Sequence, residues 1–456
     1  MEQHGQTESF KQLQSGNLLR LILAFSLPAI ASYFISELYN MVDTYFVGNT
    51  IGADAVGALG IIFPVQRLII ALSLLFAFAI TNQMSLCLGA KQTEDASRII
   101  SEGIALNFIF MLPLTSLVYF FEQPLLKLLG AKETLLPLAS EYLQIIIWGA
   151  IFLTLGTTLA RILLALGEAR LSLYLTISGA LINLILDYIL VVNWGLGVKG
   201  AAIATLISQI ASCLLAIYFF SRSLKRIHLH LSFNFRWCSM GRLILIGLPS
   251  FVVECEDAIV LAGLNWLLSI SVGVSGINSL ALAVKVYLFT FVLILGFAYG
   301  MQPIIAFNIG AKAWRRVSQT LKLTTILNFA VSLLATILTY FFTPTILAFI
   351  VPDAQLIART TPYFRQMICL LPLITFYYGS VMYLQASARA LASSVLSVMR
   401  QILLLLPVCY LAVLVFGQEG YFIFLAYPLV DLVVGILGFI LLIWQLKRLK
   451  QCQMKT

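Results

Sequence analysis

The sequence predicts an all-α integral membrane protein with twelve transmembrane helices in two pseudo-symmetric six-helix lobes. Three observations lead to this prediction. First, the 456-residue chain is 61% hydrophobic and only 10% charged, with a mean hydropathy of +0.99, whereas a soluble domain holds about 25% charged residues. Second, long apolar runs follow one another along the whole chain. Third, short segments recur at a constant offset between its two halves.

The apolar runs are expected to be membrane-spanning helices, because each reaches the roughly 20 residues that a bilayer requires. Several contain proline, which membrane helices tolerate where neighbouring groups satisfy the freed carbonyl. The predicted spans are 18–47, 55–87, 99–121, 135–160, 171–193, 198–220, 243–270, 279–308, 319–343, 360–387, 391–416 and 420–446.

Lysine and arginine predict the orientation, since short cytoplasmic loops are enriched in them. With both termini cytoplasmic, most of the 28 basic residues lie at inner helix ends. The exceptions are Lys127, Lys132, Lys199 and Arg359 outside, and Arg67, Lys285 and Arg365 within spans. We therefore expect a multi-pass protein of the cell membrane with both ends inside.

The most basic connection, 222–242, separates the two halves. It predicts an N-terminal lobe over 1–221, a cytoplasmic linker over 222–242, a C-terminal lobe over 243–446 and a basic tail over 447–456. His228 and His230 in the linker are read as solvated loop residues. No basic stripe with stacking aromatics is present, so nucleic acid is not an expected partner.

An internal duplication relates the lobes. Leu27-Pro28 recurs as Leu248-Pro249, and Gly89-Ala90-Lys91 recurs as Gly310-Ala311-Lys312, both at an offset of 221. Both copies start inside, so the repeat is parallel, and such repeats place the transport route between the halves.

Polar residues of the first half are missing from the second. Asp43 corresponds to Leu264 and Asp187 to Val408, and Leu404 occupies the position equivalent to Asn183. A requirement of the scaffold should appear in both copies, so the one-sided cluster indicates function, although sequence drift is an alternative.

Asn183 and Asp187 lie four residues apart and share one face of the fifth span. A carboxylate there costs about 2.5–3.5 kcal/mol on insertion scales. Span one adds Glu37, Asn40 and Asp43 on one arc. Oxygen ligands suit a hard cation, and a carboxylate in a low dielectric can instead take up a proton. The alternative for both aspartates is a structural hydrogen bond or an interfacial position.

Span six carries Thr205 in a stripe of small residues, which also suits close helix packing. Span seven carries Glu254, Glu256 and Asp257, which are either an acidic collar or a site that attracts cations. Lys285, like Arg67, is expected to pair with an acid or to extend toward the membrane surface.

Several classes are disfavoured. No GxxxxGK[ST] phosphate loop is present, so the chain is not its own ATPase. No nucleophile–base pair or metal cluster predicts an enzyme, and the seven scattered cysteines predict neither disulfides nor a zinc site. We expect no cofactor. With ATP hydrolysis and enzyme chemistry disfavoured, we expect transport powered by an ion gradient.

The stretches quoted above resemble the multidrug and toxic compound extrusion (MATE) family. Residues 38–48 and the segment 300–312, with its Gln-Pro, Asn and Gly-Ala-Lys elements, extend the resemblance. It covers about residues 15–446 in order and spacing. It implies two lobes around a central cavity and export by alternating access in exchange for protons or sodium.

One branch of the family keeps its cation site in the N-terminal lobe, and Asp43, Asn183, Asp187 and Thr205 match that pattern. Another branch uses acids on helices seven and ten. Asp257 matches only the first of these, and the matching region of span ten has Tyr377 and Tyr378 instead of a carboxylate. The resemblance thus favours the N-lobe site.

The resulting hypothesis is a monomeric, cation-coupled antiporter that exports organic, cationic and amphipathic compounds, with H⁺ or Na⁺ as the coupling ion and no other metal. Glu37, Asn40, Glu254, Glu256, Asp257, Lys285, Tyr377 and Tyr378 are candidates for the substrate cavity. The alternatives are a flippase for a lipid-linked precursor, which needs cationic groups in the cavity, and a membrane sensor without transport.

Overall fold

The structure is a computed structural model that describes residues 16–51, 53–129, 135–226, 229, 231, 235–272, 274–350, 354–416 and 420–455. Inside these ranges the side chains of 36–45, 47–51, 53–54 and 56–57, and of single positions in later helices, are not described. All regular secondary structure in this part of the chain is helical. This agrees with the predicted class, because a helix satisfies its own backbone hydrogen bonds in lipid.

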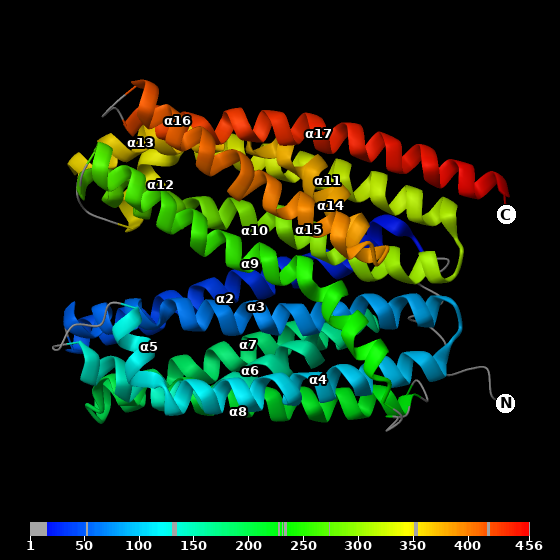
Figure 1. Cartoon of the computed structure of the whole chain (residues 1–456), viewed down its shortest axis with the longest axis horizontal. Helices are drawn as coiled ribbons and strands as arrows, with labels where there is room; N and C mark the ends of the chain where they lie inside the picture. The colour runs from blue at the N-terminus through cyan, green and yellow to red at the C-terminus, as the bar shows by residue number, and fades with distance from the viewer. Residues whose placement is uncertain are drawn as a thin grey trace. The chain divides into compact units, whose positions relative to one another are not determined.

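The described helices follow one another with short connections (Figure 1). In the first half they are α2 (Leu18–Ile51), α3 (Ala53–Gly89), α4 (Thr93–Phe120), α5 (Glu122–Leu128), α6 (Leu136–Ala165), α7 (Ala169–Asp187), the π-helix η1 (Tyr188–Asn193) and α8 (Gly197–Arg226). In the second half they are α9 (Trp237–Ser271), α10 (Val274–Gly310), α11 (Trp314–Phe341), α12 (Thr343–Ile350), α13 (Ala354–Ile368), the 3₁₀ turn η2 (Leu371–Leu373), α14 (Ile374–Ala386), α15 (Ala390–Val398), the π-helix η3 (Met399–Leu405), α16 (Leu406–Phe416) and α17 (Gly420–Lys455).

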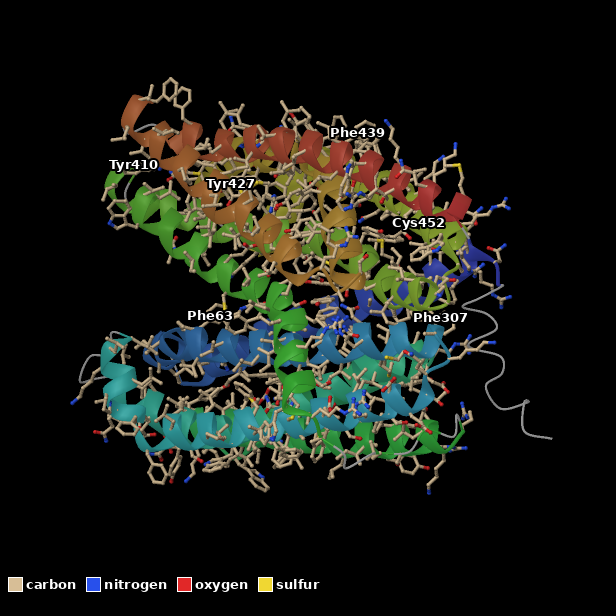
Figure 2. All side chains as sticks on the ribbon, turned by 45° about the vertical axis from the view of Figure 1, so that its right-hand side comes forward. Phe63, Phe307, Tyr410, Tyr427, Phe439 and Cys452 are labelled. Carbon is tan, nitrogen blue, oxygen red and sulfur yellow. The ribbon has the colours of Figure 1, made fainter. Side chains whose placement is uncertain are left out.

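Eleven segments of the described chain are long and apolar enough to cross a membrane. The remaining predicted span, 243–270, corresponds to α9, whose described side chains include the charged residues Arg242, Glu254 and Glu256. Span ten is longer than predicted and is interrupted by η2, where Pro372 removes a backbone donor. Large aromatic side chains are exposed on the outside of the helices, among them Phe439 on α17 and Tyr410 on α16 (Figure 2). Exposed side chains of this kind are expected where helices face lipid.

The duplication is visible in the helix bounds. α3 and α10 are both 37 residues long and α4 and α11 are both 28, and each pair begins 221 positions apart. The turn after α3 places Lys91 at φ 62°, and the turn after α10 places Lys312 at φ 56°. In each turn the next residue donates its N–H five positions back, from Gln92 to Cys87 and from Ala313 to Asn308. This is the left-handed helix end of a Schellman motif, so the Gly-Ala-Lys signature is a repeated turn.

The described chain forms two compact units, one of residues 31–254 and the other of 16–30 together with 255–456. The first parts of α2 and α9 therefore belong to a different unit from the remainder of the same helix. Pro28 and Pro249 lie inside these helices, close to the divisions. The predicted boundary over 222–242 divides the chain by sequence repeat, whereas these units divide it by contacts. The predicted boundary therefore stays a prediction.

Small residues set the packing of the first unit. α8 packs extensively along α6. A Cβ on Gly149 would lie 2.1 Å from Gln209 Oε1, and one on Gly156 would lie 3.5 Å from the Cys213 backbone. Close approach of this kind is how membrane helices gain van der Waals contact without a hydrophobic driving force. It holds α8 in a fixed register beside its neighbours.

Candidate functional site

A buried polar cluster connects α7 and α8 in the first unit. Asn183 is 1% exposed, Asp187 0% and Thr205 2%. Asn183 donates an amide N–H to Thr205 Oγ1 at 3.3 Å. Asp187 follows one turn later on the same face of α7. Three of the four residues of the predicted cation site therefore lie on two adjoining helices, buried from solvent.

The local backbone explains how α7 presents this face. α7 ends at Asp187, and the chain continues as the π-helix η1. Single π turns inside α-helices are often found at functional sites. After η1, Gly200 lets α8 start against the end of this segment, since a Cβ there would lie 3.0 Å from the Leu190 carbonyl oxygen. This contact sets the height of Thr205 relative to Asn183.

The hydroxyl groups near Thr205 serve packing. Ser208 donates to the Thr205 carbonyl oxygen at 2.8 Å, and Ser212 donates to the Leu175 carbonyl oxygen on α7 at 3.3 Å. The small-residue stripe of α8 thus packs as expected. Thr205 differs from these serines because its side chain meets another polar side chain.

Asp43 is the fourth residue of the predicted cation site. Its backbone lies in α2 and in the first unit. The side chains of Asp43, Glu37 and Asn40 lie outside the described residues, so their role in the site stays a prediction.

The structure describes the side chains of two of the three predicted acids of α9. Glu254 belongs to the first unit, where its carboxylate lies 3.7 Å from the Arg67 guanidinium. Glu256 belongs to the second unit and is 1% exposed. The side chain of Asp257 lies outside the described residues. Lys285 is exposed on α10 and forms no ion pair within the described part of the chain.

The second unit contains a charged centre that the sequence reasoning missed. Arg400 in η3 donates to Asp431 Oδ1 on α17 from Nη2 at 2.8 Å and from Nε at 3.2 Å, and Nη2 also donates to the Tyr287 hydroxyl at 3.0 Å. Arg400 is 3% exposed and Asp431 1%. The assignment of Arg400 to the basic residues at inner helix ends is wrong, because it is buried in an ion pair with Asp431.

A signal for this centre existed in the sequence. Asp431 is the only charged residue of the run 420–446, the same observation that identified Asp187 in the fifth span. In both units, the buried charge adjoins a π segment: Asp187 directly precedes η1, and Arg400 lies within η3.

Aromatic rings surround the Arg400–Asp431 pair. The Tyr287 ring stacks on Phe291 at 5.5 Å and meets Tyr427 edge-on at 6.1 Å. Phe291 in turn contacts the edge of Tyr378 at 5.5 Å. Tyr377 and Tyr378, the predicted cavity residues, are buried, and they are members of this aromatic layer.

Two repeats of long helices, with charged side chains buried within candidate membrane spans, are typical of membrane transporters. The MatE family model matches the chain at residues 28–189 and again at 249–411, once in each repeat. The chain therefore belongs to the MatE family, the multidrug and toxic compound extrusion transporters.

Similarity to known proteins extends over almost the whole chain. The FAD transporter of Shewanella oneidensis is 26% identical over 433 residues, which are 93% of this chain and 94% of that protein. The multidrug export protein MepA of Staphylococcus aureus is 27% identical over 317 residues, 68% of each chain. A crystal structure of MATE in complex with MaL6 superposes with a TM-score of 0.92 at 22% identity, covering 99% of this chain and 100% of that one.

These matches establish the general function. The protein is a multi-pass membrane transporter of the multidrug-efflux family, and family members are transporters rather than enzymes. Its substrates are small molecules and its environment is the lipid bilayer. The fold of two six-helix repeats agrees with the predicted fold class.

Proposed function

We propose that the protein is a cation-coupled antiporter whose coupling ion, H⁺ or Na⁺, binds in the first unit. Asp187 and Asp43 supply carboxylates, and Asn183 and Thr205 supply neutral oxygens. The observation that carries the proposal is the burial of Asp187 one turn from the Asn183–Thr205 hydrogen bond. Because a carboxylate in a membrane span is costly, such residues usually line ion or proton pathways.

The geometry supports an oxygen-rich site. Asn183 uses its amide nitrogen toward Thr205, so its Oδ1 stays available as an acceptor on the same face as the Asp187 carboxylate. Carboxylate and amide oxygens are suitable ligands for a hard cation, and a proton on Asp187 would equally remove the buried charge. The bound and empty states therefore differ in charge, as an ion-driven conformational change requires.

For the substrate, we propose organic amphipathic cations carried out of the cytoplasm, in a monomer with both termini inside. The similarity to MepA, named a multidrug export protein, supports this class. A lipid-precursor flippase is less well supported, because it requires cationic groups in the cavity. Of the two candidate cations, Arg67 is engaged by Glu254, and only Lys285 is left for this role among the described side chains.

A second candidate is export of flavin nucleotides or similar anionic, flat molecules. The stacked rings of Tyr287 and Phe291 favour it, since aromatic faces bind flat rings. The relative that matches 93% of the chain is named an FAD transporter.

Transport in proteoliposomes tests the proposal. A pH gradient and a sodium gradient are imposed separately, and movement of a fluorescent organic cation and of FAD is measured. We expect one gradient to drive uptake of the organic cation. Uptake of FAD alone would select the second candidate, and no driven flux of either compound would refute antiport.

Site variants test the ion site in the same assay. Asp187→Asn and Thr205→Val should reduce gradient-driven transport at least about tenfold, the effect of losing roughly 1.4 kcal/mol of coupling. Ser208→Ala is the matched control, because it removes a buried hydroxyl one turn from Thr205 that bonds only to a backbone carbonyl. If Asp187→Asn transports as fast as the control, the site assignment is wrong.

A further inference from the structure

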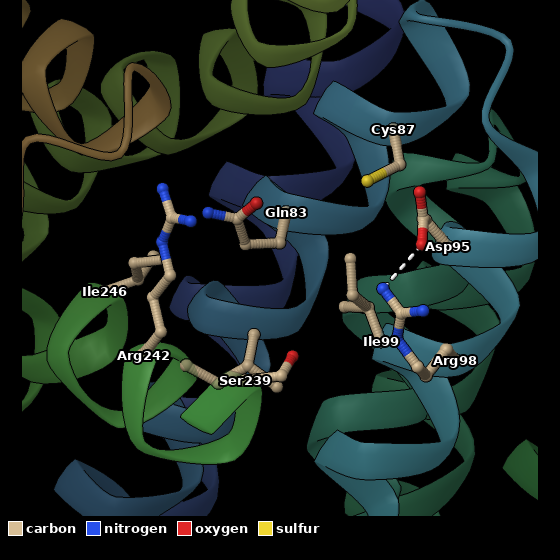
Figure 3. Close-up of a pocket in the computed structure, with 9 residues that line it drawn as sticks. Gln83, Cys87, Asp95, Arg98, Ile99, Ser239, Arg242 and Ile246 are labelled. Atoms are coloured by element: carbon tan, nitrogen blue, oxygen red, sulfur yellow. Dashed lines mark hydrogen bonds and ion pairs between the residues drawn. The ribbon is translucent and has the colours of Figure 1, made fainter. Parts of the chain in front are cut away.

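The first unit contains a cavity of about 190 Å³ where three helices meet (Figure 3). The last turns of α3, the first turns of α4 and the first turns of α9 enclose it. Candidate spans end at Gly89 and begin again at Thr93. Gln83, the innermost of the α3 residues in the cavity wall, precedes Gly89 by six positions, about 9 Å along a helix. The cavity therefore lies at the depth of lipid headgroups.

The cavity is amphipathic. Its floor is formed by Ile99, Leu243 and Ile246, which are all buried. Its rim is polar and partly exposed, with Gln83 on α3 and Arg242 on α9. A ligand that fits must present a polar or charged group to the rim and apolar atoms to the floor.

Three of the charged residues at the cavity contact one another or the start of α9. Arg98 pairs with Asp95 and also lies 3.7 Å from Glu102. Glu102 is fully buried and accepts the Arg236 N–H at 3.0 Å and the Ser239 hydroxyl. These two donors belong to the N-terminus of α9, where a carboxylate is favourable. Both carboxylates are thus directed to Arg98 or to the first turn of α9, and neither forms an ion pair with Arg242.

Arg242 is the second arginine of the cavity wall. It is exposed, lines the cavity and forms no hydrogen bond or ion pair within the described part of the chain. In Figure 3 its side chain and the Asp95–Arg98 pair lie on opposite sides of the view. A planar guanidinium binds phosphate with two parallel hydrogen bonds.

We infer that this cavity binds the phosphate group of an anionic phospholipid, with Arg242 as its counter-ion. The Gln83 amide is a second donor at the rim, and the apolar floor accommodates the first carbons of the lipid. Basic pockets between helices on the cytoplasmic side of membrane proteins bind anionic headgroups. Because Arg242 lies on α9 and Gln83 on α3, an occupied site joins these two helices and stabilises the first unit. This inference does not depend on the proposed ion site.

Thermal unfolding of the full-length protein in detergent provides the first test. The probes are phosphatidylglycerol, phosphatidylcholine with the same acyl chains, and inorganic phosphate. We expect phosphatidylglycerol to raise the unfolding temperature of the wild type, and Arg242→Gln to weaken the apparent affinity about tenfold, the usual effect of losing a charge-assisted hydrogen bond. Arg242→Lys should recover part of it. Arg222→Gln is the matched control, because Arg222 is exposed on α8 and lies outside the cavity wall.

A second measurement uses Cys87, which lines the cavity and is partly exposed. Maleimide labelling of the Cys87 peptide, quantified by mass spectrometry, should slow about tenfold in saturating phosphatidylglycerol and stay unchanged in phosphatidylcholine. Inorganic phosphate that protects equally well and competes with the lipid would identify a free phosphate site instead. Equal effects of both lipids, or an unchanged phosphatidylglycerol response in Arg242→Gln, would overturn the inference.

Discussion

The Arg400–Asp431 pair allows a quantitative prediction from geometry. Both side chains are almost fully buried, and two guanidinium nitrogens share the single acceptor Asp431 Oδ1. Asp431→Asn keeps the shape and removes the counter-charge. Removing one partner of a buried pair typically costs about 3–5 kcal/mol, because the remaining charge stays buried. We therefore expect the free energy of unfolding to fall by about that amount.

A double-mutant cycle separates this cost from simple loss of packing. Replacing both charges, as in Arg400→Met with Asp431→Leu, leaves no uncompensated charge and is expected to be near neutral, as in other buried pairs. Tyr287→Phe leaves the pair intact and removes one hydrogen bond to a charged group, with an expected loss of about 1.5–3 kcal/mol. Chemical unfolding in detergent micelles, followed by tryptophan fluorescence, measures the wild type, the single variants Arg400→Met and Asp431→Leu, their double variant, Asp431→Asn and Tyr287→Phe. If Asp431→Asn loses less than about 1 kcal/mol, or the double variant loses the sum of the single losses, the buried pair as described is refuted.

Two further predictions concern packing. Glu102→Gln should lower the free energy of unfolding by about 1–3 kcal/mol, because its carboxylate holds the first turn of α9 through the Ser239 hydroxyl; an unchanged unfolding curve would contradict that contact. Gly438→Val should prevent folding or cost more than about 3 kcal/mol, since a Cβ there would lie 2.4 Å from the Tyr377 backbone. Gly60→Ala is its control: a Cβ there meets nothing within 4 Å, so it should raise stability by about 0.5–1 kcal/mol.

Much of the fold could be predicted because its physical cause is local. A run of about 20 apolar residues spans a bilayer whatever its neighbours are, and the described spans agree with eleven of the twelve predicted ones. The repeat could also be predicted from the sequence. The offset of 221 between the Gly-Ala-Lys segments also separates the first residues of α3 and α10 and those of α4 and α11. What sequence reasoning did not foresee were the π segments η1 and η3 and the interruption of span ten at η2.

The candidate site was predicted unevenly. Asn183 and Asp187 share a helix face by spacing alone, and the resemblance to the family added Thr205, which the structure places in contact with Asn183. By contrast, Arg400 and Asp431 lie 31 positions apart on different helices. Nothing local relates them, so the arginine looked like a basic residue at a helix end.

The sequence by itself determined the membrane class, the duplicated architecture and the costly acids inside the spans, because each depends on composition or on spacing within one helix. The tertiary structure decided which buried charges meet. It joined Asn183 to Thr205 and Arg400 to Asp431, and it placed Arg242 at a cavity with no ion-pair partner among the described residues. Pairing of this kind follows from the rotation and height at which helices pack. Those are set by contacts such as Gly200 against Leu190, which the order of residues in one helix does not contain.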